Sequence, residues 1–206
     1  MHVCVSFFIY LSMIGIITNI GMSSEGNNIY YIYQSFFKLG YDYLIIPLTN
    51  IDDIKSKIDK CKGIIMQGGD DYLDIHLEII KYIYDIDMPL LAICMSMQAM
   101  GVLFNGKLKN IFNHKDRNKY SHYITIKENT LLYKILGSNK ILVNSSHKEC
   151  LEYTDLNVSA HSNCIEAIED TSKKFFLGLQ WHPEKMIEYD KLERKIFEYF
   201  YQVINK

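Results

Sequence analysis

The sequence predicts an α/β protein with a mainly parallel central sheet and helices on both faces. Short apolar runs alternate with segments whose apolar residues recur at helical spacing, a pattern typical of such a three-layer arrangement. The chain has 206 residues, of which 49% are hydrophobic and 22% charged, so it is large enough to bury a full sheet. We expect residues 13–206 to form one domain, with residues 1–12 an N-terminal extension or the product of a start site placed too early.

The first half of the chain alternates strongly between strand and helix patterns. Apolar runs predict strands at 13–18, 43–47, 63–66 and 89–93. Helical spacing predicts helices at 29–39, 50–60, 73–84 and 96–104, and Gly40 is placed to end the first of them. A Gly- and Asn-rich turn is expected at 19–28.

The second half contains shorter strands separated by turns. They are expected at 123–127, 141–144, 158–161, 165–169 and 175–180. A final helix is expected at 190–203, because Leu192, Ile196, Phe200 and Val203 form an apolar stripe. No segment has the length and apolar character of a membrane span.

Charge and cysteine usage argue against several classes of protein. The net charge of −2 gives no overall attraction to nucleic acid or acidic membranes, so neither is expected as a partner. The basic residues Lys107, Lys109, Lys115, Arg117 and Lys119 are expected to form a solvated loop.

The five cysteines are widely spaced and include no Cys-x-x-Cys pair, which disfavours both a disulfide framework and a zinc cage. We expect no metal, no cofactor and a reducing cytoplasmic location. The apolar stretch near the start lacks a preceding Lys or Arg and a small-residue cleavage site, so it is not expected to direct export.

Cys94 lies where an apolar run, Leu90 to Ile93, gives way to a helix pattern. Such a nucleophile elbow exposes a side chain at the carboxyl end of a sheet, where α/β proteins bind ligands. His182 and Glu184 could supply a base and the carboxylate that orients it. The alternatives are a cysteine that packs as a small hydrophobe and a surface turn before Pro183.

Four segments in a fixed order carry a family resemblance. They are Gln67-Gly68-Gly69-Asp70, the Cys94 elbow, Val143-Asn144-Ser145-Ser146-His147 and Leu177-Gly178-Leu179-Gln180-Trp181-His182-Pro183-Glu184. Together with Glu166-Ala167-Ile168-Glu169 they resemble the class I glutamine amidotransferase-like superfamily. Within it they resemble the γ-glutamyl hydrolase branch, peptidase family C26, which includes the γ-glutamyl-γ-aminobutyrate hydrolases.

The resemblance implies a flavodoxin-like fold and a Cys-His-Glu triad. Cys94 would be the nucleophile, His182 its base and Glu184 the orienting carboxylate. Gln98 matches a family contact to the glutamyl part of the substrate. His147 matches a histidine at the pocket rim, although a loop histidine satisfied by backbone is an equal reading.

The chemistry of such a triad can be stated directly. The thiolate attacks the δ-carbonyl of a γ-glutamyl amide, the amine leaves with a proton from His182, and water then hydrolyses the thioester. The backbone N–H of Met95, at a helix N-terminus, and that of Gly69 are candidates for the oxyanion hole.

Several residues depart from the family pattern. Ala92 and Ser96 replace two glycines around the nucleophile, Met95 replaces an arginine, and Lys148 and Glu149 replace a histidine and a glutamine. These changes leave the amine leaving group open.

Three functions follow from these observations. The first is a free-standing hydrolase of a small γ-glutamyl amide, which could be a homodimer. The second is a glutaminase subunit that supplies ammonia to a separate synthase. The third is a binding protein that has lost catalysis.

Overall fold

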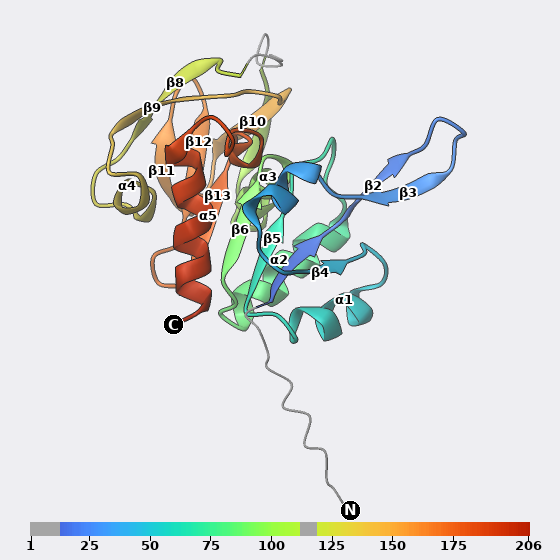
Figure 1. Cartoon of the computed structure of the whole chain (residues 1–206). Coiled ribbons are helices and arrows are strands. Elements are labelled where there is room, and N and C mark those ends of the chain that lie inside the picture. The colour runs from blue at the N-terminus through green and yellow to red at the C-terminus, as the bar shows by residue number, and fades with distance from the viewer. Residues whose placement is uncertain (1–12, 112–118) are drawn as a thin grey trace, which may run out of the picture.

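The computed structural model describes residues 13–111 and 119–206 and contains a nine-stranded sheet between two helical layers (Figure 1). The order of the sheet is β4-β1-β5-β6-β13-β12-β11-β8-β9. Its strands are β4 (Tyr43–Ile46), β1 (Ile14–Ile17), β5 (Gly63–Met66), β6 (Leu90–Ile93), β13 (Phe176–Leu179), β12 (Ile165–Glu169), β11 (Asn157–His161), β8 (His122–Ile126) and β9 (Lys140–Val143). The expected α/β fold class is confirmed.

The first five strands of this order pair in parallel. Their connectivity is that of a flavodoxin-like sheet, in which the strand order reverses next to the first strand. All four residues of β1, β5, β6 and β13 are buried, because helices cover both faces of this part of the sheet. The carboxyl ends of β5, β6 and β13 therefore meet at one edge.

The other four strands extend the sheet by antiparallel pairing, from β12 to β9. A separate two-stranded ribbon consists of β7 (Lys107–Asn110) and β10 (Glu149–Tyr153). It packs against the helix that follows β6, because Leu151 contacts Gly101 so closely that a side chain at Gly101 would clash.

The helices divide between the two faces of the sheet. One face is covered by α1 (Ile51–Ile58), α2 (Asp74–Asp85) and α3 (Met95–Leu103), and the other by α4 (Leu131–Leu136) and α5 (Lys191–Ile204), with the 3-10 turn η1 (Gln34–Leu39). Alternate strand residues serve the two cores: Leu91 faces α5 and Ala92 faces α3. The final helix buries Ile196 and Phe200 of its predicted stripe.

The helix expected at 29–39 is wrong in its first part. Residues Asn19–Met22 (β2) and Asn28–Tyr31 (β3) form an antiparallel hairpin that projects from the body of the molecule (Figure 1). Gly26, at φ 81°, closes the turn, and Ile29, Tyr30 and Tyr31 favour the strand that follows. Only η1 retains the predicted helical turn, and Gly40 ends it in the left-handed conformation.

Three further short elements were not predicted: α4, β7 and β10. Helix α4 carries both end signals, because the Thr130 hydroxyl accepts a hydrogen bond from the Tyr133 N–H and Gly137 adopts φ 67°. The helix has only six residues, which are too few for the apolar spacing to show it.

Some expectations concern residues outside the described part of the chain. These are the status of residues 1–12 and the solvation of Lys115 and Arg117. Lys107 and Lys109 are exposed as expected, but the loop prediction is wrong for them because both lie on strand β7. Within residues 13–111 and 119–206, every helix is too short or too polar to cross a membrane.

Candidate active site

Cys94 joins β6 to α3 in a strained backbone conformation. Its φ of 53° and ψ of −109° lie where residues with a side chain are rarely found. This conformation turns the chain sharply, so that the thiol lies at the carboxyl edge of the sheet while β6 stays paired with its neighbouring strands. The structure therefore gives Cys94 the elbow geometry predicted from the sequence.

His182 and Glu184 follow β13, the strand that pairs with β6. The His182 Nδ1–H donates to Glu184 Oε1 at 2.7 Å, and both side chains are buried. Asn144 holds the main chain of His182 through two bonds, accepting from its N–H at 2.9 Å and donating to its carbonyl at 2.8 Å. Glu184 lies in the short 3-10 turn η2 (Pro183–Lys185).

The imidazole of His182 is strongly perturbed. Complete burial would lower its pKa, but the negative charges of Glu184 and Cys94 and hydrogen bonds to both side chains outweigh burial and raise it to about 9. A protonated imidazole is thus favoured between the Cys94 and Glu184 side chains.

The glycine turn after β5 packs directly on this pair. A Cβ at Gly68 would lie 2.6 Å from His182 Cε1 and 2.9 Å from Cys94 Cβ, so a glycine is required there. A Cβ at Gly69 would lie 2.8 Å from Asn19 Nδ2 and 3.1 Å from Met95 Cε. The thiol and imidazole therefore converge under the turn.

The residues that depart from the family pattern are accommodated. The Ser96 hydroxyl donates to the Gln67 carbonyl at 2.8 Å, which ties the elbow helix to the glycine turn. Ala92 is paired with Gly178 on β13. A Cβ at Gly178 would lie 2.8 Å from Met97 Cγ, so the glycine that gives α3 room is on the neighbouring strand.

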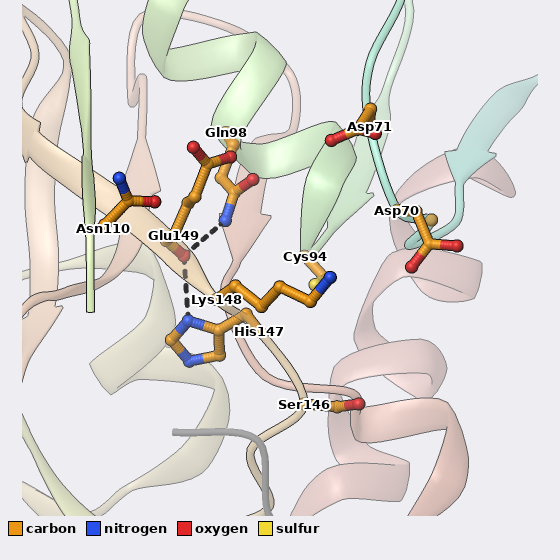
Figure 2. Close-up of a pocket in the computed structure, with 10 residues that line it drawn as sticks. Asp70, Asp71, Cys94, Gln98, Asn110, Ser146, His147, Lys148 and Glu149 are labelled. Carbon is orange, nitrogen blue, oxygen red and sulfur yellow. Dashed lines mark hydrogen bonds between the residues drawn. The ribbon is translucent and has the colours of Figure 1, made fainter. Parts of the chain in front are cut away.

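A pocket with a volume of about 230 Å³ opens beside Cys94 (Figure 2). Gln98 and His147 both contact the Glu149 carbonyl in its wall: Gln98 Nε2 donates at 2.7 Å and His147 Nδ1 at 2.9 Å. Gly69 lines the same pocket. Met95 is buried and is the first residue of α3.

The pocket carries charges of both signs. Asp70, Asp71 and Glu149 provide carboxylates and Lys148 an ammonium group that points into the pocket (Figure 2). The sequence-predicted residues Cys94, Gly69, Gln98 and His147 therefore share one cavity, with His182 and Glu184 behind the thiol.

Sequence reasoning assigned no role to several supporting residues. Gln180 Nε2 lies 3.7 Å from Cys94 Sγ, and the Tyr33 ring packs edge-on against His182 with centroids 5.9 Å apart. Asn144 and Asn19 hold backbone near the site. Asn144 and Gln180 lie inside the matched motifs. Asn19, in the expected turn at 19–28, and Tyr33, in the expected helix at 29–39, carried no signal.

The arrangement contains the parts needed for covalent catalysis. A thiol at an elbow, an imidazole beside it and a buried carboxylate on the far ring nitrogen can together form and hydrolyse a thioester. Met95 follows Cys94 at the start of α3, and Gly69 of the glycine turn lines the same pocket as Cys94.

The sequence and the fold of this chain are similar to those of known proteins. The chain is 28% identical over 213 residues to the glutamine amidotransferase-like protein YvdE of Lactococcus lactis, covering 84% of this chain and 89% of the relative. It is 27% identical over 190 residues to a subunit of the glutamine-hydrolysing GMP synthase of Methanosarcina acetivorans, covering 90% and 95%. The fold matches the glutaminase domain of Trypanosoma brucei CTP synthase, solved with bound acivicin, at a TM-score of 0.69 and 15% identity, covering 95% and 94%.

The family model for Peptidase C26 matches residues 71–184, a span that includes Cys94, His182 and Glu184. That span is more than half of the 206 residues. The chain belongs to the Peptidase C26 family of the class I glutamine amidotransferase-like superfamily.

Proposed function

We propose that this protein hydrolyses a γ-glutamyl amide to L-glutamate and an amine through a γ-glutamyl thioester on Cys94. The observation that carries the proposal is the strained Cys94 elbow beside the buried His182–Glu184 pair, opening on a pocket lined by both acidic and basic groups. No cofactor takes part in the proposed reaction.

The reaction begins with attack of the Cys94 sulfur on the δ-carbon of the substrate. The oxyanion accepts hydrogen bonds from the backbone N–H groups of Met95 and Gly69, and the tetrahedral intermediate collapses when His182 protonates the departing amine. Water then attacks the thioester with His182 as base, which releases glutamate and restores the thiol. Glu184 holds the imidazole in the tautomer and orientation that both steps require.

The pocket suits the polar end of a glutamyl group. That end carries an α-ammonium and an α-carboxylate, and the pocket offers carboxylates from Asp70, Asp71 and Glu149 and the ammonium of Lys148. Gln98 donates to Glu149 and to Gln180, at 2.7 and 3.1 Å, which leaves its amide oxygen for the substrate ammonium. His147 also lines this pocket.

The second candidate function is a glutaminase subunit that passes ammonia to a separate synthase. It is favoured by the Methanosarcina acetivorans relative, a subunit of GMP synthase that aligns with 90% of this chain. Both functions use the same thioester chemistry and differ in the leaving group and the partner.

The test is glutamate release by the purified protein from glutamine, γ-glutamyl-aminobutyrate, γ-glutamyl-polyamines and γ-glutamyl peptides. We expect one class of amide to be cleaved, and Cys94→Ala to reduce the rate by at least about a thousandfold because the nucleophile is lost. Cys61→Ala is the matched control, since Cys61 is also buried but lies in the core beneath α1.

The outcomes separate the candidates. Turnover of glutamine alone would favour the ammonia-supplying subunit. Absence of turnover, with Cys94 also inert to a γ-glutamyl electrophile, would contradict both and leave a binding protein that has lost catalysis.

A further inference from the structure

A second cluster of reactive side chains adjoins the pocket through His147. It contains His147, Cys164 and Glu166, all buried, and their nearest potential ligand atoms lie within 4.8 Å of one another. The three come from the segment before β10, the turn between β11 and β12, and β12 itself. The reaction at Cys94 gives Cys164 and Glu166 no role.

Glu166 is a buried carboxylate that is only half satisfied by the protein. Its Oε1 accepts from His122 Nε2 at 2.8 Å, from Ser162 Oγ at 2.7 Å and from Cys164 Sγ at 3.4 Å. Its Oε2 is buried and has no hydrogen-bond partner within the described part of the chain. A fully buried anionic oxygen without a partner is costly unless a cation or donor meets it.

His147 is oriented as a metal ligand is. Its Nδ1 contacts the Glu149 carbonyl at 2.9 Å, and a carbonyl can only accept, so Nδ1 carries the hydrogen (Figure 2). In the neutral ring the lone pair is then on Nε2. Metal-binding histidines nearly always donate their other ring N–H in this way, which fixes the tautomer and raises the basicity of the ligand nitrogen.

We propose that His147 Nε2, Cys164 Sγ and a carboxylate oxygen of Glu166 bind one Zn²⁺ ion. A mixed nitrogen, sulfur and oxygen set suits Zn²⁺, whereas Mg²⁺ and Ca²⁺ select oxygen ligands. Three protein ligands leave the fourth tetrahedral position for a water molecule. Binding releases the thiol proton of Cys164 to solvent and changes no oxidation state.

This proposal reverses the expectation of no metal that rested on the cysteine and histidine spacing. His147, Cys164 and Glu166 follow no zinc spacing along the chain, and only the antiparallel half of the sheet brings them together. The ion would fix the wall of the pocket, since the Glu149 carbonyl contacts both His147 and Gln98. The proposal does not depend on catalysis by Cys94.

The test is metal binding by protein stripped with a chelator under reducing conditions. We expect one Zn²⁺ per chain by elemental analysis, and a thiolate-to-metal charge-transfer band when Co²⁺ replaces Zn²⁺. Cys164→Ala should remove the band and weaken Zn²⁺ binding at least about tenfold. Cys61→Ala, at a buried cysteine outside the cluster, should retain both.

A further variant tests whether the metal binds to Cys94 and His182 instead. Cys94→Ala must retain the ion, because Cys94 and His182 could otherwise bind it themselves. Loss of Zn²⁺ in Cys94→Ala, or an unchanged Co²⁺ band in Cys164→Ala, would overturn the proposal.

A measurement on the unaltered chain covers the case in which Cys164→Ala does not fold. X-ray absorption at the zinc edge should show sulfur together with nitrogen or oxygen neighbours. A spectrum without sulfur, or wild-type protein that binds no stoichiometric Zn²⁺, would equally contradict the assignment.

Discussion

Backbone strain at Cys94 and the absence of a side chain at Gly68 together allow the thiol and the imidazole to approach each other. The positive φ at Cys94 lifts the thiol to the edge of the sheet, and Gly68 lets the imidazole of His182 approach beneath the turn. Burial then makes the charges of Glu184 and Cys94 effective enough to raise the pKa of His182 despite desolvation. At this scale the sequence motifs were sufficient to find the candidate reacting side chains, but not the close contact that Gly68 makes with His182 and Cys94.

We expect Gly68→Ala to lower kcat by about 10- to 100-fold, because its methyl group would lie 2.6 Å from His182 Cε1 and displace the ring from the thiol. Steady-state kinetics on the best γ-glutamyl substrate measures the effect. Gly21→Ala is the matched control, since a Cβ there meets only the Tyr31 ring, at 3.0 Å, and the Ile29 side chain in the β2–β3 hairpin. Equal activity in the two variants would contradict the close packing at Gly68.

Helix α5 supports the site from behind through a buried carboxyl. The Trp181 Nε1–H donates to Glu193 Oε2 at 2.9 Å, and Trp181 is the neighbour of His182. Burial raises the pKa of Glu193 to about 8, the Trp181 hydrogen bond opposes this, and the charges of Asp190 and Glu184 add to it. The amphipathic stripe predicted this helix but not an acid on its buried face.

Because of Glu193, we expect the free energy of unfolding to fall as pH rises. Between its ordinary pKa of about 4.5 and about 8, the folded state keeps a proton that the unfolded state has lost, so stability falls across this window. Glu193→Gln keeps an acceptor for Trp181. In this variant we expect the free energy of unfolding to fall less steeply with pH, by up to about 1.4 kcal/mol per pH unit.

Urea unfolding at pH 5, 6.5 and 8, roughly spanning the window, measures this effect. Glu198→Gln, at an exposed position of the same helix, is the control and should follow the unaltered protein. If the unfolding free energy of Glu193→Gln changed with pH as steeply as that of the unaltered protein, Glu193 would ionise normally and the prediction would be wrong.

The whole molecule is organised around β13, which joins the parallel and antiparallel parts of one sheet. One apolar core extends along a single face from Ile14 to Ile204 and includes residues of both parts. Cys94 follows β6 on the parallel side of β13, and Glu166 of the proposed zinc cluster lies on β12 on the antiparallel side. A continuous core of this kind favours unfolding as one unit.

We therefore expect the tryptophan and backbone signals to report one transition. Trp181 is the single tryptophan of the chain and is fully buried, so its fluorescence should shift to the red on unfolding. Denaturation followed by fluorescence and by far-ultraviolet circular dichroism should give coincident midpoints. Separate midpoints would contradict the single domain expected over residues 13–206.

The sequence alone determined the α/β class and most strands and helices, because strand and helix periodicities are local. It also identified the family and the candidate residues Cys94, His182 and Glu184, because their motifs are contiguous. It failed at residues 29–31, where pairing with Asn19–Met22 overrides an apparent helical spacing.

Only the tertiary structure decided the contacts between segments distant in the chain. Gly68 meets His182, Asn144 holds the His182 main chain, and Cys164 lies beside His147 and Glu166. No local pattern encodes such contacts, because they depend on the order in which strands enter the sheet. The pairing of β6 with β13 brings the thiol to the imidazole, and the antiparallel half builds the cluster in which we place zinc.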